Sequence, residues 1–223
     1  MQKQPHKNTV QDSIEEALKN LNIHSDVLHA GRTDKGVHAL NQVVCFKIPQ
    51  FWDKNKLLSA LNKILHPYIH IKKLFVVSDN FNPRFDAKKR SYRYVITSRF
   101  TPHSADYMTY YPVKIDIKLL KKALKLFEGK HDFEYFAKTG SDVSSYTREI
   151  YKTNIYKYKH LTVIKIQGNG FLRGQIRIMI NFLLKINEGE LSLNDLEKQL
   201  CKKKLITKHL SPPSGLYLER IWY

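Results

Sequence analysis

Patterns typical of helices and strands follow one another along the chain in an order that occurs twice. A helix, strands, a second helix and more strands are predicted over the first hundred residues, and a similar series follows. Elements mixed in this way favour an α+β fold. We therefore predict two similar halves, residues 1–100 and 101–223, although no residue-level repeat relates them.

Apolar residues recur at helical spacing in five stretches, with capping or stop residues at their ends. Asn8 is the predicted N-cap of the first helix, Asp53 of the second and Ser192 of the last. Arg173 and Arg177 are predicted to lie one turn apart on the fourth helix. The predicted helices cover residues 10–22, 53–66, 117–127, 171–183 and 193–203.

Strands are predicted where β-branched and aromatic residues cluster or alternate with polar ones. In the strand over residues 91–97, Tyr92 and Tyr94 share one face and Arg93 lies on the other. A loop over residues 101–112, rich in Pro, His and Tyr, marks the predicted boundary between the halves. The other predicted strands cover residues 27–29, 42–48, 69–77, 150–157, 161–167 and 216–223.

The charge balance points to a polyanionic partner. Lys and Arg number 38 against 20 Asp and Glu, which gives a formal net charge of +18. Such an excess repels itself unless a polyanion is close, so nucleic acid is the predicted partner, with a solvated lysine surface as the alternative. Tyrosines interleaved with cations over residues 88–94 suit base stacking beside phosphate contacts.

Cysteine and histidine usage gives no indication of a metal site. Cys45 and Cys201 lie far apart within apolar or amphipathic patterns, which predicts reduced packing residues and a cytoplasmic protein. Neither His-x3-His nor Cys-x2-Cys spacing occurs, so no bound metal is expected. Long apolar runs and a secretion signal are absent from the sequence, so no membrane association is expected.

Asp34 is the carboxylate with the most unusual surroundings. It lies in the run Ala30-Gly31-Arg32-Thr33-Asp34-Lys35-Gly36-Val37-His38-Ala39, between two glycines and two cations. Glycine lets the backbone approach a ligand closely, so Asp34 can present an unobstructed carboxylate at a loop tip. The alternative is a tight turn in which the side chain bonds its own backbone.

Four blocks of sequence together resemble the tRNA pseudouridine synthase A family. The first is the Gly-Arg-Thr-Asp-x-Gly-Val-His loop, matched from Gly31 to His38. Three more blocks agree and occur in the order of the family: residues 85–94, residues 168–172 leading to Ile176-Arg177, and residues 212–218. They extend over nearly the whole chain.

The resemblance implies a fold and an activity. The implied fold is α+β, with two similar halves whose antiparallel sheets join around a central basic cleft and whose helices pack on the outer faces. The implied activity is conversion of uridine to pseudouridine, without a cofactor, at positions 38, 39 and 40 of the tRNA anticodon stem-loop. The implied oligomer is a homodimer.

The resemblance also implies roles for individual residues. Asp34 would act on the target nucleotide as nucleophile or as base, two routes that residue identities cannot separate. Arg177 would pair with Asp34 and keep it ionised, and Tyr92 would stack on the uracil. Without the resemblance, a surface arginine and a buried sheet tyrosine are the alternatives. Arg32 would fill the gap left by a flipped base, and the predicted substrate-binding residues are Arg32, Lys35, Arg90, Arg93 and Arg173.

The sequence also departs from the family pattern. Family members normally begin with a strand bearing Tyr-Asp-Gly, whereas this chain opens at residues 1–6 with Met-Gln-Lys-Gln-Pro-His, so we expect one central strand to be missing. Arg173-Gly174-Gln175 stands where relatives often carry His-His or Tyr-Lys. A non-catalytic protein that holds tRNA without modifying it is therefore the alternative function.

Overall fold

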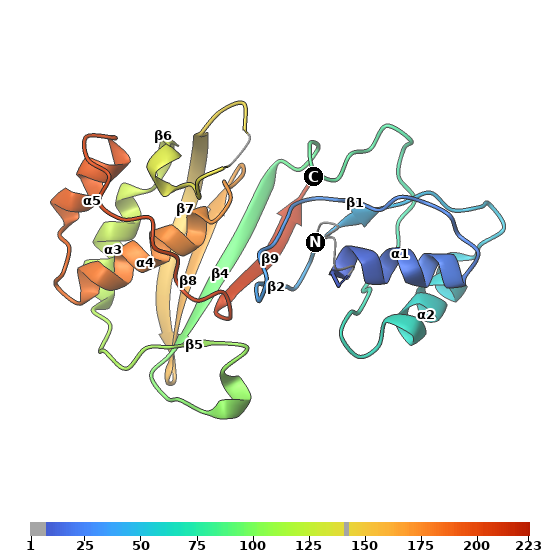
Figure 1. Ribbon diagram of the computed structural model, residues 1–223, viewed down its shortest axis with the longest axis horizontal. Coiled ribbons are helices and arrows are strands. Elements are labelled where there is room, and N and C mark those ends of the chain that lie inside the picture. Colours follow the sequence, from blue (N-terminus) through green and yellow to red (C-terminus); the bar gives the residue numbers. More distant parts are fainter. Residues whose placement is uncertain (1–7, 141–142) are drawn as a thin grey trace. The chain divides into compact units, whose positions relative to one another are not determined.

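A computed structural model describes residues 8–140 and 143–223, and the chain forms two compact units (Figure 1). The first unit comprises residues 1–33 and 42–87, and the second comprises residues 34–41 and 88–223. The prediction that a first central strand is missing rests on residues 1–6, which lie outside the described residues.

The first unit contains two helices and one small sheet. Helix α1 covers Val10–Asn20 and helix α2 covers Lys54–Leu65, while strands β1 (Leu28–His29) and β3 (Val44–Cys45) pair antiparallel. The helices bury one apolar stripe each, since Leu18 of α1 and Leu61 of α2 are fully buried in one core.

The helix starts follow from local hydrogen bonds. The predicted cap Asn8 is wrong, because Thr9 and Asp12 form a capping box in which each side chain accepts from the other residue's backbone. Asp53 caps α2 as predicted, with its carboxylate 2.9 Å from the backbone nitrogens of Asn55 and Lys56.

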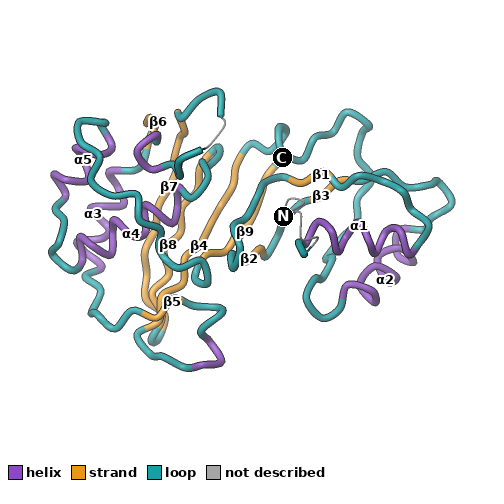
Figure 2. Tube along the Cα trace, in the orientation of Figure 1, coloured by secondary structure: helices purple, strands orange, loops and turns teal. Residues whose placement is uncertain are grey.

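The strand predicted over residues 69–77 is wrong. Figure 2 shows only loop after α2, up to the start of the second unit's sheet. The backbone N–H and C=O of Ile71 both bond to the side chain of Asn62, at 2.7 and 2.9 Å, rather than to a neighbouring strand. Phe75 and Val76 consequently remain exposed despite their high β-propensity.

A mixed sheet of seven strands forms the second unit. Six strands follow the order β2-β9-β4-β8-β7-β6, and β5 also pairs with β4. The pairs β2·β9 and β4·β5 are parallel, and the others are antiparallel. The bounds are β2 His38–Ala39, β4 Lys89–Thr97, β5 Thr109–Tyr110, β6 Gly129–Asp132, β7 Thr147–Tyr158, β8 Leu161–Gly168 and β9 Leu216–Trp222.

Three helices cover one face of this sheet (Figure 1). They are α3 (Ile117–Leu126), α4 (Gln175–Asn187) and α5 (Leu193–Leu200), and short 3-10 turns occupy Pro102–Ser104 and Glu134–Phe136. Tyr94 and Ile96 of β4 point into the core beneath the helices, whereas Arg93 and Val95 line the opposite face, as the alternation predicts.

The α+β class is confirmed, and the units divide elsewhere than at the predicted boundary. Residues 89–97 form the central strand of the second unit, and β5 returns from the loop after it to pair with β4, so the second unit begins at residue 88. The units are also unequal, because the first has a two-stranded sheet and the second a seven-stranded one.

Further differences concern helix ends. Helix α4 begins at Gln175, because Gly174 adopts a left-handed conformation at its N-cap. Arg173 therefore lies in a turn before the helix and not on it. Helix α5 ends at Leu200, where Cys201 is exposed rather than a packing residue. The hairpin of β7 and β8 is confirmed, with Lys159 at positive φ in its turn. No described helix is long and apolar enough to cross a bilayer.

Gly215 tests how closely the sheet is packed before β9. A Cβ at this position would lie 2.6 Å from Thr109 Oγ1 and 2.7 Å from the backbone oxygen of Val95. We expect Gly215→Ala to lower the free energy of unfolding by about 1–3 kcal/mol in urea titrations, because the backbone atom cannot move aside. Gly170→Ala is the control, since its methyl would meet only Arg148 side-chain atoms at 3.6 Å. Equal stability of the two variants would contradict this prediction.

Candidate active site

The loop that carries Asp34 is anchored to the sheet of the second unit. The backbone N–H of Val37 donates to Asp34 O at 3.1 Å, so Asp34 begins a tight turn, but its side chain bonds Arg177 and not its own backbone as the turn alternative had it. Gly36 has φ of +79° and lies against Pro213, where a Cβ would come within 2.9 Å of the ring. Strand β2 then pairs with β9, His38 opposite Tyr217. The turn fixes the loop through backbone hydrogen bonds, so the Asp34 carboxylate does not take part in it.

His38 holds the loop from its other end. Its ring stacks on Tyr217 at 4.7 Å and on Tyr107 at 5.5 Å between centroids. Its Nε2 lies 2.7 Å from the backbone oxygen of Asp106, which can only accept, so this nitrogen donates. His38 thus shapes the loop by satisfying a backbone carbonyl.

Arg177 pairs with Asp34 as predicted. Its Nη1 donates to Asp34 Oδ2 at 2.9 Å, while its Nε donates to the backbone oxygen of Ser211 at 2.7 Å. The side chain of Arg177 is 13% exposed and that of Asp34 is 32% exposed. The guanidinium is therefore fixed by two acceptors, and the carboxylate keeps a face open to a ligand.

The place of Arg177 on α4 explains why it needs such partners. Nine of the 13 residues of α4 are buried, so this helix runs through the core and a charge on it is costly unless paired. Arg177 is the third residue of the helix, where the helix dipole also favours a nearby anion. Both effects favour a position of the Asp34 carboxylate next to Arg177.

Tyr92 lies on the same face of β4 as the core and within electrostatic range of Asp34. Its ring meets that of Phe171 edge-on, with centroids 5.3 Å apart. Burial raises the pKa of Tyr92 to about 12, the positive charge of Arg90 opposes this rise, and the charge of Asp34 adds to it. Tyr92 therefore keeps its proton near neutral pH. The structure brings together all three residues predicted to be catalytic.

The five predicted substrate-binding residues are distributed differently. Arg90 lies close to Tyr92, and Lys35 is exposed on the Asp34 loop. Arg93 is on the opposite face of the sheet, where its guanidinium lies 5.2 Å from the ring centroid of Tyr217. Arg173 is exposed before α4, and Arg32 is an exposed residue of the first unit. Arg90 thus lies near Tyr92 and Lys35 lies on the Asp34 loop, whereas Arg93 faces away from Tyr92.

Tyr94 supports the site and had no predicted role. Its hydroxyl lies 2.6 Å from Thr109 Oγ1 and donates to the backbone oxygen of Pro212 at 2.8 Å. Pro212 follows Ser211, the acceptor that fixes Arg177. The signals in the sequence were the Tyr-x-Tyr alternation and the Pro-Pro-Ser-Gly block, which meet only in the fold. Arg148, near the start of β7, is another residue that the sequence did not indicate. It lies within electrostatic range of Arg90.

No group of three or more His, Cys, Asp or Glu side chains that could hold a metal ion occurs among residues 8–140 and 143–223. The candidate site instead combines one carboxylate, guanidinium groups and a phenol.

Comparison with known proteins agrees with the sequence blocks. The family model described as "tRNA pseudouridine synthase" matches residues 1–86 and 123–223. A tRNA pseudouridine synthase A of Campylobacter jejuni subsp. doylei is 44% identical over 222 residues, which are 99% of this chain and 92% of the relative. Those of Helicobacter pylori and Helicobacter hepaticus are 40% and 38% identical, over 99% and 100% of this chain and 92% of each relative.

Tyr94→Phe tests the support of the site. Removing the hydroxyl leaves Thr109 Oγ1 and the Pro212 carbonyl without this buried partner, so we expect unfolding stability to fall by about 1–2 kcal/mol. Tyr156→Phe is the control, because Tyr156 is 38% exposed on the opposite face of the sheet. Urea unfolding followed by circular dichroism measures both variants, and indistinguishable midpoints would show that the Tyr94 hydroxyl supports nothing.

Proposed function

Because the chain belongs to the tRNA pseudouridine synthase family, we propose that it is an isomerase that converts uridine to pseudouridine at positions 38, 39 and 40 of the tRNA anticodon stem-loop. We propose that Asp34 acts on the target nucleotide and that no cofactor takes part. The observation that supports this most directly is the Asp34–Arg177 ion pair beside Tyr92, within the motifs of the family.

The reaction places clear demands on the site. The bond from uracil N1 to ribose C1′ must break, the base must turn, and a bond from C5 to C1′ must form while C5 loses a proton and N1 gains one. The base is normally stacked, so the nucleotide must first be flipped out, at a cost of a few kcal/mol. A fixed, ionised and partly open carboxylate such as Asp34 suits attack on the nucleotide or abstraction of a proton.

The neighbours of Asp34 suit the same steps. Arg177 donates to the Asp34 carboxylate at 2.9 Å and so holds it in one orientation toward a bound nucleotide. Tyr92 offers a ring on which the uracil can stack and a protonated hydroxyl near a base placed over Asp34. The net charge of +18 suits a polyanionic substrate such as tRNA.

A protein that binds tRNA without modifying it is the competing proposal. It accounts for the charge and the exposed tyrosines equally well. It leaves without explanation a carboxylate that is paired, fixed and still 32% exposed beside the half-buried Tyr92. Release of tritium from uridine labelled at C5 separates the two proposals, since only the isomerase liberates this label.

Asp34→Asn tests the role of the carboxylate. We expect tritium release to fall below detection while tRNA affinity stays within a few-fold, because phosphate contacts supply most of the affinity. Glu197→Gln, an exposed carboxylate on α5, is the control and should retain full activity. Turnover by the purified Asp34→Asn variant would remove Asp34 from the mechanism.

The same variants test the position in tRNA. In cells that lack the gene, pseudouridine at positions 38 to 40 should be absent, return with the wild-type chain and stay absent with Asp34→Asn. Loss of pseudouridine elsewhere in tRNA, with these positions unchanged, would contradict the proposed substrate site.

We also propose that the chain forms a homodimer, as the resemblance implies. The face of the large sheet away from the helices has a cavity of about 390 Å³ beside Tyr156 and Tyr158, and the latter is 60% exposed. Such apolar surface favours association with another protein surface. Light scattering should give about twice 26.2 kDa. Tyr158→Glu should shift the mass toward the monomer, whereas Tyr151→Glu, outside the cavity, should not. A monomeric wild-type chain would refute the proposal.

A further inference from the structure

A short segment of the second unit contacts the framework of the candidate site at both of its ends. Residues 106–109 lead into β5, which pairs with the end of β4. His38 Nε2 donates to the backbone oxygen of Asp106 at 2.7 Å. Tyr217 Oη donates to the backbone oxygen of Tyr107 at 2.6 Å. The segment is thus fastened to β2, β9 and β4.

Thr109, at one end of this segment, reaches the Arg177 side of the ion pair through Tyr94. The two hydroxyl oxygens lie 2.6 Å apart, and Tyr94 donates its one hydrogen to the Pro212 carbonyl at 2.8 Å, so Thr109 Oγ1 must donate to Tyr94. Ser211 precedes Pro212, and its backbone oxygen accepts from Arg177 Nε at 2.7 Å. Thr109, Tyr94 and Ser211 are all buried, so these bonds are shielded from water.

The backbone of Ser211 is bonded to Arg177 twice. Its N–H donates to the backbone oxygen of Arg177 at 3.1 Å, and its carbonyl accepts from the side-chain Nε. A shift of the Ser211–Pro212 peptide would therefore move the guanidinium and change the 2.9 Å distance from Nη1 to Asp34 Oδ2. Burial raises the pKa of Tyr94 and the positive charge of Arg177 opposes this rise, so the Tyr94 hydroxyl is within electrostatic range of the guanidinium.

His38 connects the other end of the segment to the Asp34 side of the ion pair. It follows Asp34 closely in the chain, and the bond from Val37 N–H to Asp34 O closes the turn between them. Because His38 Nε2 is fixed on the Asp106 carbonyl, this turn is tied to the same segment that holds Tyr94. Both members of the ion pair are therefore linked to residues 106–109.

We propose that residues 106–109 set the geometry of the Asp34–Arg177 ion pair, and that Thr109 and His38 are positioning residues for the isomerisation. This inference rests on the proposed function, in which Asp34 must meet a flipped nucleotide. A group that acts on a bound substrate must be held closely, because a displacement of about 1 Å can cost about a hundredfold in rate. Thr109 is buried and bonds Tyr94, so it acts on the reaction through the ion pair.

Thr109→Val tests the Arg177 side, since it replaces the hydroxyl by a methyl group of similar size. We expect the single-turnover rate of tritium release to fall about tenfold or more, while tRNA affinity stays within about twofold, because Thr109 is too buried to contact the RNA. Thr109→Ser, which keeps the hydroxyl, should restore most of the rate. If Thr109→Val does not fold, Tyr94→Phe removes the same hydrogen bond from its other end and should give the same loss.

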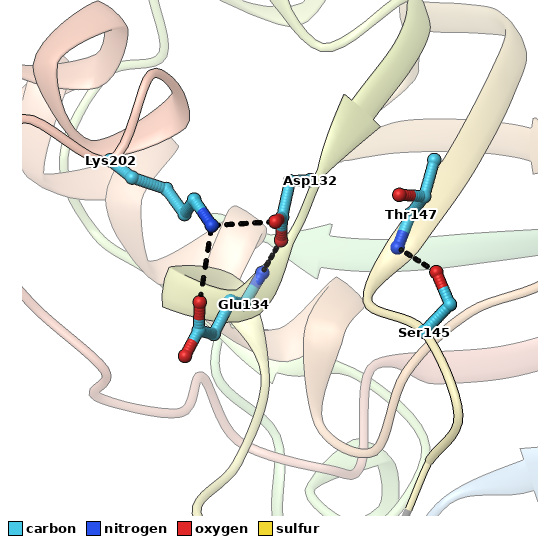
Figure 3. A network of polar contacts seen from close by, with 5 residues as sticks. All are labelled: Asp132, Glu134, Ser145, Thr147 and Lys202. Carbon is cyan, nitrogen blue, oxygen red and sulfur yellow. Dashed lines mark hydrogen bonds and ion pairs between the residues drawn. The ribbon is translucent and has the colours of Figure 1, made fainter.

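Two controls separate positioning from a general loss of stability. Thr153→Val removes a hydroxyl of β7 that is also buried and that donates to Glu128 Oε1 at 2.7 Å. Asp132→Asn weakens the network of Figure 3, in which Asp132 of β6 pairs with Lys202 at 2.6 Å, at the end of the strand order opposite β2. Both variants should keep the wild-type rate where they are folded. Equal rate losses in Thr153→Val and Thr109→Val would overturn the positioning role.

A double variant tests whether both residues act on one ion pair. His38→Phe keeps an aromatic ring against Tyr217 and removes the donor to Asp106. If Thr109→Val and His38→Phe displace the same pair, the rate loss of the double variant should be about that of the larger single loss. Losses that multiply would overturn a common positioning segment.

A measurement without turnover separates this inference from the proposed function. In the free chain, the Nε–H of Arg177 should exchange with water about tenfold faster in Thr109→Val than in the wild type or in Thr153→Val, as followed by nuclear magnetic resonance. An unchanged exchange rate would overturn the positioning of Arg177 even if the chain forms pseudouridine. Absence of tritium release by the wild-type chain would overturn the proposed function, whereas the exchange rates would still report on residues 106–109.

Discussion

The Asp34–Arg177 ion pair is the interaction on which the arrangement of the candidate site depends. Asp34 comes from a short loop and Arg177 from a helix that is otherwise mostly buried, so neither position alone fixes the other. The Ser211 carbonyl accepts a hydrogen bond from Nε of Arg177 and so orients the guanidinium. In this orientation Nη1 points at the Asp34 carboxylate. Removing either partner would leave a charge in poorly hydrated surroundings.

The surrounding structure works to keep that orientation. The segment from Ser211 to Gly215 touches each of the parts that must agree: Ser211 accepts from Arg177, Pro212 accepts from Tyr94, and Pro213 packs on Gly36 of the Asp34 loop. Gly215 closes the segment against β4, where its carbonyl accepts from Val95 N–H at 2.8 Å. One short segment thus links the strand that carries Tyr92, the helix that carries Arg177 and the loop that carries Asp34.

The sequence predicted those features that depend on local patterns. Helical spacing located α1, α2 and α3, and strict alternation identified β4 and the correct face for Tyr92, Tyr94 and Arg93. The strand predicted over residues 69–77 is wrong because a high β-propensity does not supply a neighbouring strand. The side chain of Asn62 bonds the backbone of Ile71 instead. The predicted start of α4 is wrong because Gly174 adopts a left-handed conformation at the N-cap. The helix therefore begins at Gln175 and does not include Arg173.

The residues of the candidate site could likewise be predicted only where they lie in local sequence motifs. Asp34, Tyr92 and Arg177 lie in short motifs whose chemistry can be recognised without a fold. Tyr94 could not be found in this way, because its hydroxyl bonds residues distant in sequence, Thr109 and Pro212. The alternation of the strand also predicted that Arg93 lies on the face opposite Tyr92, as the structure has it.

The arginines near the site differ in how much of their charge remains for a ligand. Arg177 pairs with Asp34 through Nη1 and donates to the Ser211 carbonyl through Nε. The negative carboxylate therefore largely cancels the electrostatic field of Arg177 at a bound phosphate. Among residues 8–140 and 143–223, Arg148 donates through Nη1 to the backbone oxygens of Ser145 and Thr147, which are neutral acceptors. The two arginines thus differ in their acceptors, since Arg177 pairs with a carboxylate and Arg148 donates to backbone carbonyls.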